Sequence, residues 1–329
     1  MPRSTNRVPV LHQSYRAVAA GGTRFDWFCT ASASTISGGR RVRARTASGS
    51  PLRAAHGNAH AGSHVPRHDL MSVARLIRQR IPPAWQPPIR LLYERTRGLL
   101  ERELPIVRAA VRAGDHVADV GANHGLYTHV FARRRAIVEA FEPQPECVAV
   151  LAAYAARRRS RLVRVHPVAL STASGRGTLH VPSGSASSPS ASLHVARNRD
   201  AAVDVALEPL DSFALFDLAL IKIDVEGAEL DVLRGGRETL RRSWPLLFVE
   251  IEQRHHREPI TDIFDAVTCL GYDGAFLDGG GRLQPLTAFD VDRHQHDSVL
   301  HPERGLPYVN NFLFSPSGVT GIAARRWRI

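Results

Sequence analysis

The segment 116-HVADVGANHGLYT-128 determines how the rest of this chain is interpreted. Its hydrophobic pattern predicts a buried strand over residues 117–120, followed by a helix that starts near Leu126. Gly121 and Gly125 bracket the turn between them, and because neither has a Cβ, the backbone there can turn sharply and approach a ligand closely. Such a strand–turn–helix unit is where open α/β sheets bind nucleotide-like cofactors. We therefore expect a cofactor over this turn.

Strand and helix patterns alternate after the turn. Further strands are predicted at 137–141, 162–165, 177–181, 202–207, 218–223, 245–249 and 311–314, and helices at 126–133, 146–157, 229–234 and 260–270. The alternation predicts an α/β, Rossmann-like fold, with a mostly parallel seven-stranded sheet and helices on both faces. Residues 311–314 are expected to form a C-terminal antiparallel edge strand.

The composition divides the chain into four parts. Residues 1–66 are rich in Ser, Ala, Gly and Arg, and they hold too little apolar surface to offset the entropy of ordering, which predicts a disordered basic tail. Residues 71–113 are predicted to form a helical flank, with helices at 71–81, 88–100 and 103–112. Residues 114–316 are predicted to form the main domain, and residues 317–329 a C-terminal tail. Met71 is the second of only two methionines and opens the first helical pattern. Residues 1–70 are therefore either a tail or translated sequence upstream of the natural start.

The net charge of +12 is concentrated outside the predicted domain. Residues 1–70 contain ten arginines and two aspartates, which leaves 33 basic and 29 acidic residues for 71–329. Because the excess lies in the tail, we expect no nucleic-acid partner. The three cysteines have neither a disulfide nor a zinc spacing, which favours a reducing cytoplasm, and no apolar run is long enough for a membrane span.

Acidic residues at two predicted strand ends define the kind of cofactor. Glu142 lies 23 residues after Asp119, at the end of the second strand, where a carboxylate holds the ribose hydroxyls of a nucleotide. The turn lacks the G-x-G-x-x-G spacing that admits a pyrophosphate, and Asp119 would repel a phosphate. An acid at this place suits the sulfonium and amine of S-adenosylmethionine (SAM). The alternative is that Asp119 only caps the turn.

Six segments together resemble the FkbM family of SAM-dependent methyltransferases. They are 119-DVGANHGLYT-128, 141-FEPQP-145, 168-VALS-171, 210-LDSF-213, 221-IKIDVEGAE-229 and 245–250. The resemblance covers roughly residues 100–315, including 308-YVNNFLF-314. It implies a class I methyltransferase fold, SAM as the cofactor and, most often, methylation of a hydroxyl oxygen.

The resemblance also implies roles for individual residues. The turn would hold the methionine part of SAM, the start of the next helix would line it, Glu142 would bind the ribose, and two small residues would border the adenine. The implied cofactor-binding residues are Asp119, Gly121, Ala122, Asn123, Gly125, Tyr127, Thr128, Glu142, Val168 and Ala169. Asp224 and Glu226 would face the reacting methyl group.

Lys222, the only lysine in the chain, lies in the same motif as those two carboxylates. Residues 222, 224 and 226 alternate along an extended strand end, so their side chains are expected on one side. We therefore predict Asp224 as the base or the acceptor-orienting group, with Glu226 second and Lys222 beside them. The alternative is a structural network of ion pairs.

Glu250, His255 and His256 follow the next strand and are interpreted as the polar rim of a substrate cleft. A metal site or a base is the alternative at this place, but the spacing of the histidines is not that of a metal site, and no metal is predicted. The acceptor is expected to be a hydroxyl on a sugar, glycolipid or secondary metabolite. A nucleic-acid (RNA) methyltransferase and a non-catalytic SAM-binding protein are the alternative functions.

Overall fold

The computed structural model describes residues 80–157, 162–181, 192–193, 201–295 and 308–318. The predicted tail 1–66 and nearly all of the predicted helix 71–81 lie outside these ranges. The strands are β1 (His116–Val120), β2 (Ile137–Phe141), β3 (Val163–His166), β4 (Ala169–Leu170), β5 (Gly175–Val181), β6 (Ala201–Glu208), β7 (Leu218–Ile223), β8 (Leu246–Glu250), β9 (Tyr272–Leu277), β10 (Leu283–Pro285) and β11 (Asn311–Pro316). The α-helices are α2 (Gln86–Arg97), α3 (Leu104–Ala110), α4 (Leu126–Arg133), α5 (Pro145–Arg157), α6 (Glu229–Gly235), α7 (Arg237–Ser243), α8 (Thr261–Cys269) and α9 (Val291–His294). Short 3-10 helices are η1 (Pro83–Trp85), η2 (Leu210–Phe213), η3 (Gln253–His255) and η4 (Leu286–Ala288).

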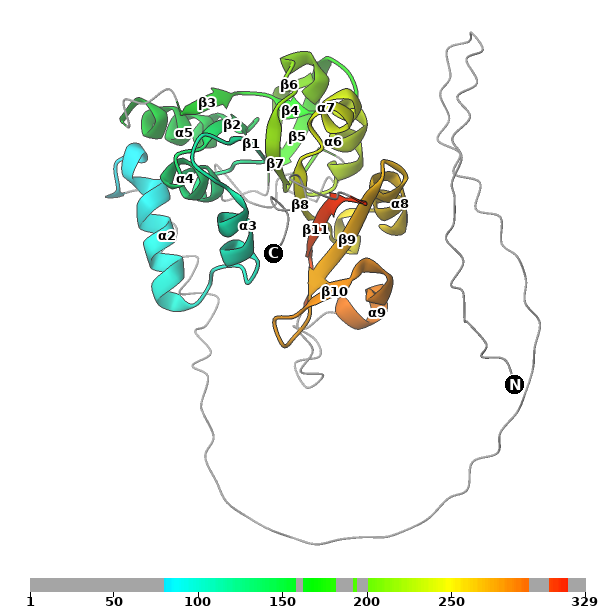
Figure 1. Ribbon diagram of the computed structural model, residues 1–329. Coiled ribbons are helices and arrows are strands. Elements are labelled where there is room, and N and C mark those ends of the chain that lie inside the picture. The colour runs from blue at the N-terminus through cyan, green and yellow to red at the C-terminus, as the bar shows by residue number, and fades with distance from the viewer. Residues whose placement is uncertain (1–79, 158–161, 182–191, 194–200, 296–307, 319–329) are drawn as a thin grey trace, which may run out of the picture. The chain divides into compact units, whose positions relative to one another are not determined.

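Eight strands of the described residues form one sheet, in the order β10-β9-β11-β8-β7-β1-β2-β3 (Figure 1). The five strands from β8 to β3 run parallel, whereas β11 is antiparallel to both of its neighbours. From β1 the chain moves outward through β2 and β3, and it then returns to β7 and β8 on the other side of β1. The strand order therefore reverses between β1 and β7, which is where an open α/β sheet binds its ligand.

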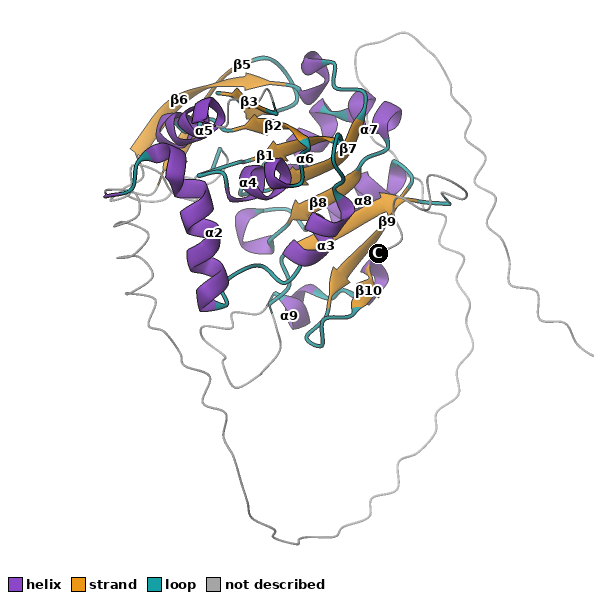
Figure 2. Ribbon diagram, turned by 60° about the vertical axis from the view of Figure 1, so that its left-hand side comes forward, coloured by secondary structure: helices purple, strands orange, loops and turns teal. Residues whose placement is uncertain are grey.

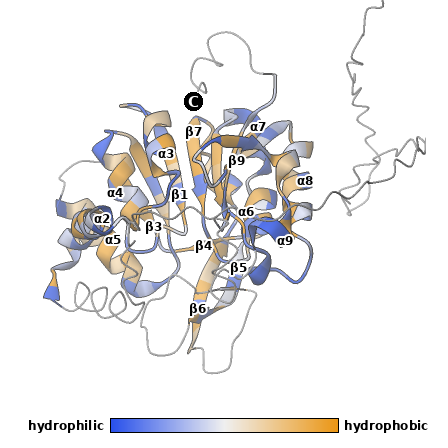
Figure 3. Cartoon of the chain, turned by 90° about the horizontal axis from the view of Figure 1, so that it is seen from below, coloured by the Kyte–Doolittle hydropathy of each residue, from blue (hydrophilic) through white to orange (hydrophobic). Residues whose placement is uncertain are grey.

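Side chains of β1 alternate between two hydrophobic cores, one on each face of the sheet. Ala118 and Val120 pack with α6, α7 and α8, which contribute Phe264 among others. Val117 packs on the opposite face with α3 and α4, which contribute Phe131. Figure 2 shows these two helical layers, and Figure 3 shows the hydrophobic character of β1 and β7 between them. By this alternation, Asp119 points to the face that α4 covers.

A smaller sheet of three strands, in the order β4-β6-β5, is inserted between β3 and β7. β5 and β6 pair antiparallel along all of β5, and Leu179, Val181 and Val205 form a small core of their own. Ser192 pairs with His180 of β5 through two backbone hydrogen bonds. This pairing brings a short piece of the chain between β5 and β6 back to the small sheet.

The predicted α/β class, with a mostly parallel sheet and helices on both faces, is confirmed, but two details of the sheet are wrong. The main sheet has eight strands in the described residues, not seven: the predicted strands 177–181 and 202–207 belong to the smaller sheet as β5 and β6, and the other six predicted strands are joined by β9 and β10, which were not predicted. Residues 311–314 are not at an edge, since β11 lies between β8 and β9, and the side chains of Phe312 and Phe314 are fully buried. A strand covered on both faces carries consecutive apolar residues, which is the pattern of this segment.

Among the helices of the described residues, none is both long and apolar enough to cross a membrane.

Candidate active site

The turn after β1 requires glycine at both of its ends. Gly121 has φ +71°, and a Cβ there would lie 1.8 Å from the carbonyl oxygen of Asp224. Gly125 has φ +79°, and its Cβ would lie 2.8 Å from a methyl group of Leu151. Both positions need the left-handed region that side chains disfavour, as well as space that a side chain would fill. The turn thus lies directly against the end of β7.

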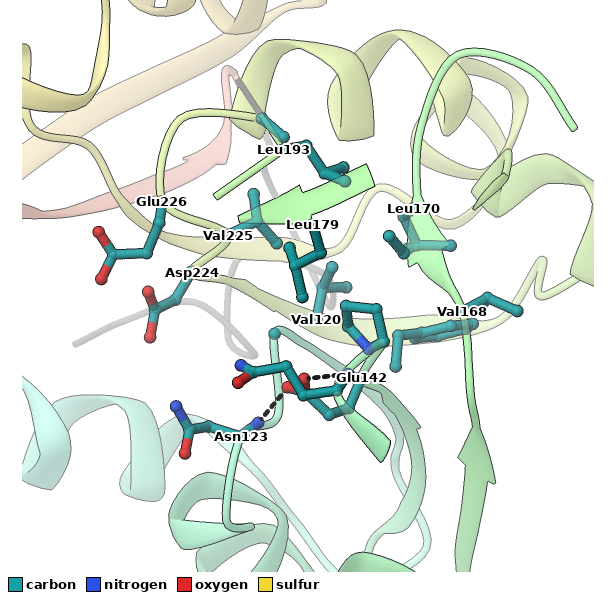
Figure 4. Close-up of a pocket in the computed structure, with 16 residues that line it drawn as sticks. Val120, Asn123, Glu142, Val168, Leu170, Leu179, Leu193, Asp224, Val225 and Glu226 are labelled. Carbon is teal, nitrogen blue, oxygen red and sulfur yellow. Dashed lines mark hydrogen bonds between the residues drawn. The ribbon is translucent and has the colours of Figure 1, made fainter. Parts of the chain in front are cut away.

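Glu142, at the end of β2, is tied to this turn by its carboxylate. Oε2 accepts a hydrogen bond of 2.7 Å from the backbone N–H of Asn123, and Oε1 accepts one of 2.9 Å from that of Gln144 (Figure 4). The residue is 3% exposed. Burial raises the pKa of this carboxyl to about 7, although the two backbone N–H groups favour its ionised form. Each oxygen still has a lone pair with which to accept a further hydrogen bond from a ligand.

Lys222 holds the turn and the end of β7 together from below. Its Nζ donates a 2.9 Å hydrogen bond to the carbonyl oxygen of Gly121 and lies 3.0 Å from Oδ2 of Asp224. Nζ is also 3.7 Å from Oδ1 of Asp119, whose other oxygen accepts a 2.5 Å hydrogen bond from Thr128. Burial alone would lower the pKa of Lys222, but Asp224 and Asp119 outweigh it and raise the pKa. Lys222 is therefore a buried, charged clamp.

Asp119 lies beneath the turn and is completely buried. Burial raises the pKa of its carboxyl, and the charge of Lys222 together with the Thr128 hydroxyl opposes that rise. A carboxylate in this position supports the turn through Lys222. A direct contact of Asp119 with a cofactor stays a prediction.

Two carboxylates follow β7. Asp224 is paired with Lys222, and its side chain keeps 28% of its surface exposed. Glu226 has a left-handed backbone, with φ +54°, and its Oε2 lies 2.8 Å from Nε2 of His255. His256, the next residue, forms a separate pair with Glu229, with Nε2 and Oε2 2.9 Å apart. The predicted side-by-side arrangement of Asp224 and Glu226 is present in Figure 4, where both point to the same end of a pocket.

Glu250 ends β8, which pairs in parallel with β7, so it lies beside Asp224 on the next strand. Its Oε1 accepts a 2.6 Å hydrogen bond from the side chain of Asn310. Burial raises the pKa of Glu250, and the charges of Asp224 and Glu101 add to the rise. Glu252 instead accepts a 2.7 Å hydrogen bond from the Tyr308 hydroxyl. Burial alone would raise the pKa of Glu252, but this hydrogen bond and the charge of Arg254 help to lower it. The described part of the chain contains no group of three His, Cys, Asp or Glu side chains arranged to hold a metal ion.

A pocket of about 550 Å³, including its part open to solvent, lies over the turn. The predicted site residues that line it are Gly121, Asn123, Glu142, Val168, Ala169, Asp224 and Glu226. In Figure 4 the carboxylates of Asp224 and Glu226 lie at one end and the apolar Val168 and Leu170 at the other. The pocket is therefore polar at one end and apolar at the other.

Other predicted site residues lie around the pocket rather than on its wall. Ala122, Gly125, Tyr127 and Thr128, like Asp119 and Lys222, are absent from its lining among the described residues. The Tyr127 ring packs on Lys222, with Nζ 5.4 Å from the ring centre, and its hydroxyl donates to Glu101. His255 and His256 line a second pocket between α6 and the start of α8. The functional roles of all these residues stay predictions.

Sequence reasoning missed much of the apolar wall. The lining residues that it did not single out are Val120, Phe141, Pro143, Gln144, Leu170, Leu179, Leu193, Val225 and Ala228. All of these except Leu179 and Leu193 lie inside segments already quoted for the resemblance, which was a usable signal. Leu179 comes from β5 of the smaller sheet and Leu193 follows Ser192, which pairs with that strand, and no local pattern links either residue to the pocket.

The family comparison accords with this geometry. The family model described as the methyltransferase FkbM domain matches residues 119–273, from the aspartate before the turn to the start of β9. This segment is a methyltransferase FkbM domain. The predicted family is thereby confirmed, and membership in it implies the use of SAM. No curated protein sequence matches the chain.

Solved structures similar to this chain include other methyltransferases. Methyltransferase FkbM from Methylobacillus flagellatus is 16% identical, with a TM-score of 0.38, and the match covers 75% of this chain and 59% of that one. A precorrin-6y C5,15-methyltransferase from Geobacter metallireducens is 9% identical, with a TM-score of 0.36, and the match covers 65% and 86%. A SAM-dependent O-methyltransferase from Thermotoga maritima is 10% identical, with a TM-score of 0.35, and the match covers 67% and 66%. This chain thus spans about 59% of the length of the Methylobacillus protein.

The chemistry of the pocket in the FkbM domain fits SAM. Glu142 offers carboxylate oxygens to a ribose diol, Gly121 leaves room for a close approach, and Val168 and Leu170 offer an apolar surface to an adenine. Asp224 and Glu226 supply negative charge at the other end of the pocket, where a sulfonium is favoured.

Proposed function

We propose that this protein is a SAM-dependent O-methyltransferase that acts on a hydroxyl of a sugar, glycolipid or secondary metabolite. The observation that carries the proposal is the placement of two carboxylates, Asp224 and Glu226, at the end of the pocket opposite its apolar wall. When bound, SAM supplies an electrophilic methyl group. A hydroxyl acceptor must be oriented toward that methyl group and must lose one proton, and a carboxylate serves both needs.

The protein residues have distinct tasks in this proposal. Glu142 binds the ribose hydroxyls, and the turn from Gly121 to Asn123 forms the floor under the methionine part of SAM. Lys222 keeps Asp224 in place through their 3.0 Å contact, so that this carboxylate can orient the acceptor hydroxyl. Glu226 lies on the same side, at the more enclosed position, with 13% of its side chain exposed. Alignment of this kind contributes up to about 7–11 kcal/mol to such reactions.

A labelling assay tests the function. SAM with a radiolabelled methyl group is incubated with the protein and with an extract of small molecules and glycans. We expect label in the extract that survives alkali, as a methyl ether does, and none with the Asp224→Ala variant. Label that is released by ribonuclease would favour the RNA methyltransferase instead. If the folded protein binds SAM but transfers label neither to the extract nor to RNA, the result favours a non-catalytic SAM-binding protein.

The affinity for SAM should depend on pH through Glu142. Ribose hydroxyls donate to the ionised carboxylate, and burial holds its pKa at about 7 in the free protein. Binding should therefore tighten as the pH rises through 7, by about tenfold between pH 6 and pH 8, because only about a tenth of a group with this pKa is ionised at pH 6. Calorimetric titrations at several pH values measure this change.

Glu142→Gln is the control for this pH dependence, since glutamine keeps the shape but does not titrate. The variant should bind SAM more weakly, with an affinity that no longer rises across pH 7. A rise of the same size in Glu142→Gln would show that another group is responsible.

A further inference from the structure

The pair formed by Glu226 and His255 connects the two pockets of the FkbM domain. Glu226 lines the pocket over the turn, and His255 lines the second pocket beside α6 and α8. Their side chains are 13% and 7% exposed, and Nε2 of the imidazole lies 2.8 Å from Oε2 of the carboxylate. An ion-pair contact of this length between two buried groups restricts the position of the carboxylate.

The backbone around this pair is held in an unusual shape. Glu226 adopts φ +54°, which is uncommon for a residue with a side chain, and its carbonyl oxygen accepts a 2.7 Å hydrogen bond from the Ser192 hydroxyl. A Cβ on the following Gly227 would lie 2.8 Å from the carbonyl oxygen of His255. The loop after β7 and the segment after β8 are thus packed closely, and an uncommon backbone conformation held by its surroundings is typical of functional sites.

We propose that Glu226 accepts the proton in methyl transfer and that His255 is its positioning residue. This proposal rests on the proposed function and deepens it, because Asp224 then has only the orienting task. Asp224 is paired with Lys222, whose Nζ lies 3.0 Å from Oδ2, so one of its carboxylate oxygens is already engaged by a cation. Glu226 has no lysine or arginine at hydrogen-bond distance among the described residues, and its partner is an imidazole.

The proton and electron balance of the step is simple. The acceptor hydroxyl gives its proton to the carboxylate of Glu226 while its oxygen forms a bond to the methyl carbon. The bond between carbon and sulfur breaks, and its electron pair stays on the sulfur, which loses its positive charge. Imidazole at Oε2 of Glu226 leaves Oε1 for the acceptor hydroxyl.

The charges around Glu226 set the pH range of its ionisation. Burial raises the pKa of Glu226, the contact with His255 opposes that rise, and the charges of Asp224 and Glu252 add to it. Arg254, on the same segment as His255, also interacts with Glu226. Removing the imidazole should therefore raise the pKa of Glu226 further, because the contact that opposes the rise is lost.

The test compares SAM with S-adenosylhomocysteine, which has a neutral sulfur, and needs no acceptor. An ionised carboxylate facing the sulfur favours SAM, so the ratio of the two dissociation constants should change in favour of SAM as Glu226 ionises. Glu142 affects both ligands alike and cancels in the ratio. The ratio is measured by calorimetry between pH 5 and pH 8.5 with the full chain and with the His255→Asn, Glu226→Gln and His256→Asn variants.

His256→Asn is the matched control, because His256 pairs with Glu229 at 2.9 Å, nearly the same distance, while Glu229 does not line the pocket over the turn. Thermal unfolding confirms that each variant is folded. We expect the change of the dissociation-constant ratio with pH to vanish in Glu226→Gln. In His255→Asn it should occur at a higher pH than in the parent, and in His256→Asn at the same pH as in the parent.

Two results would overturn the proposal while leaving the proposed function intact. One is a pH-dependent change in the ratio of dissociation constants that persists in Glu226→Gln. The other is a change at the same pH in His255→Asn as in the parent, even if this variant binds both ligands more weakly by the same factor. If neither ligand binds the folded parent protein, the proposed function fails and this inference fails with it.

Discussion

A Gly121→Ala variant is expected to lose SAM binding, with a free energy of unfolding at least about 3 kcal/mol below that of the parent. The new Cβ would lie 1.8 Å from the carbonyl oxygen of Asp224, which is backbone and cannot rotate away. The left-handed conformation, with φ +71°, adds about 1–2 kcal/mol. Denaturant unfolding and calorimetry with SAM measure the two effects.

Gly98→Ala separates the two causes. Gly98 also has a positive φ, +65°, but a Cβ there would have nothing within 4 Å. This variant should lose only the conformational part, roughly 1 kcal/mol, and should bind SAM like the parent. Equal losses of stability in the two variants would contradict the close packing of the turn against the end of β7.

A Lys222→Met variant is expected to lower the free energy of unfolding by about 3–5 kcal/mol, the usual effect of removing one partner from a buried ion pair. Methionine has a similar length and keeps the packing against Tyr127, but it leaves Asp119 buried without its counter-charge. The carbonyl oxygen of Gly121 also loses its donor, so SAM binding should weaken together with stability. Unfolding in urea at pH 7 provides the measurement.

The double variant Lys222→Met/Asp119→Asn shows whether the effect comes from the charge. Asparagine keeps an oxygen for the Thr128 hydroxyl but carries no charge. The double variant should be more stable than the sum of the single losses implies, by at least about 1 kcal/mol. Strictly additive losses would mean that Lys222 acts through packing alone, and they would contradict its role as the buried counter-charge of Asp119.

The sequence predicted the centre of the fold because local patterns determine it. β1, β2, β7 and β8 are short apolar runs between turn signals, and each is present within about one residue of its predicted bounds. The bracketing glycines predicted the turn because glycine is needed there both for its positive φ and for the space a Cβ would occupy. The same patterns predicted that Glu142, Asp224 and Glu226 would meet at one edge, and they line one pocket.

Two features that were not predicted, the strands β9 and β10 and the part of the pocket wall formed by Leu179 and Leu193, depend on contacts between residues distant in sequence. Asp273 and Gly274 interrupt the pattern of β9, yet Gly274 is required because a Cβ there would lie 2.8 Å from Leu286 and 2.9 Å from Phe314. The position of β11 between β8 and β9 is likewise set by pairing with residues about 40 and 60 positions earlier. Such pairings leave little local signal.

The directions of two site residues were also beyond the sequence. Asp119 was predicted to hold the methionine part of SAM and Lys222 to lie beside Asp224 and Glu226; the structure places both under the turn, with 0% and 4% of their surface exposed. The alternation along β1 and β7 directs them to the face covered by α4, but that face is known only once the strands are paired. Of the three residues in the alternative of a structural ion-pair network, Lys222 and Asp224 are paired, whereas Glu226 lies against His255.

Calorimetric titration of the full chain with SAM tests the central claim, that the pocket over the turn holds this cofactor through Glu142. The account predicts saturable binding at one site, weakened roughly ten- to hundredfold in Glu142→Ala, as expected for lost hydrogen bonds to a charged group. Glu146→Ala, which removes an exposed carboxylate in the first turn of α5, should bind like the parent. No binding to the folded parent protein, or equal affinities for SAM in the parent and in folded Glu142→Ala, would contradict the claim.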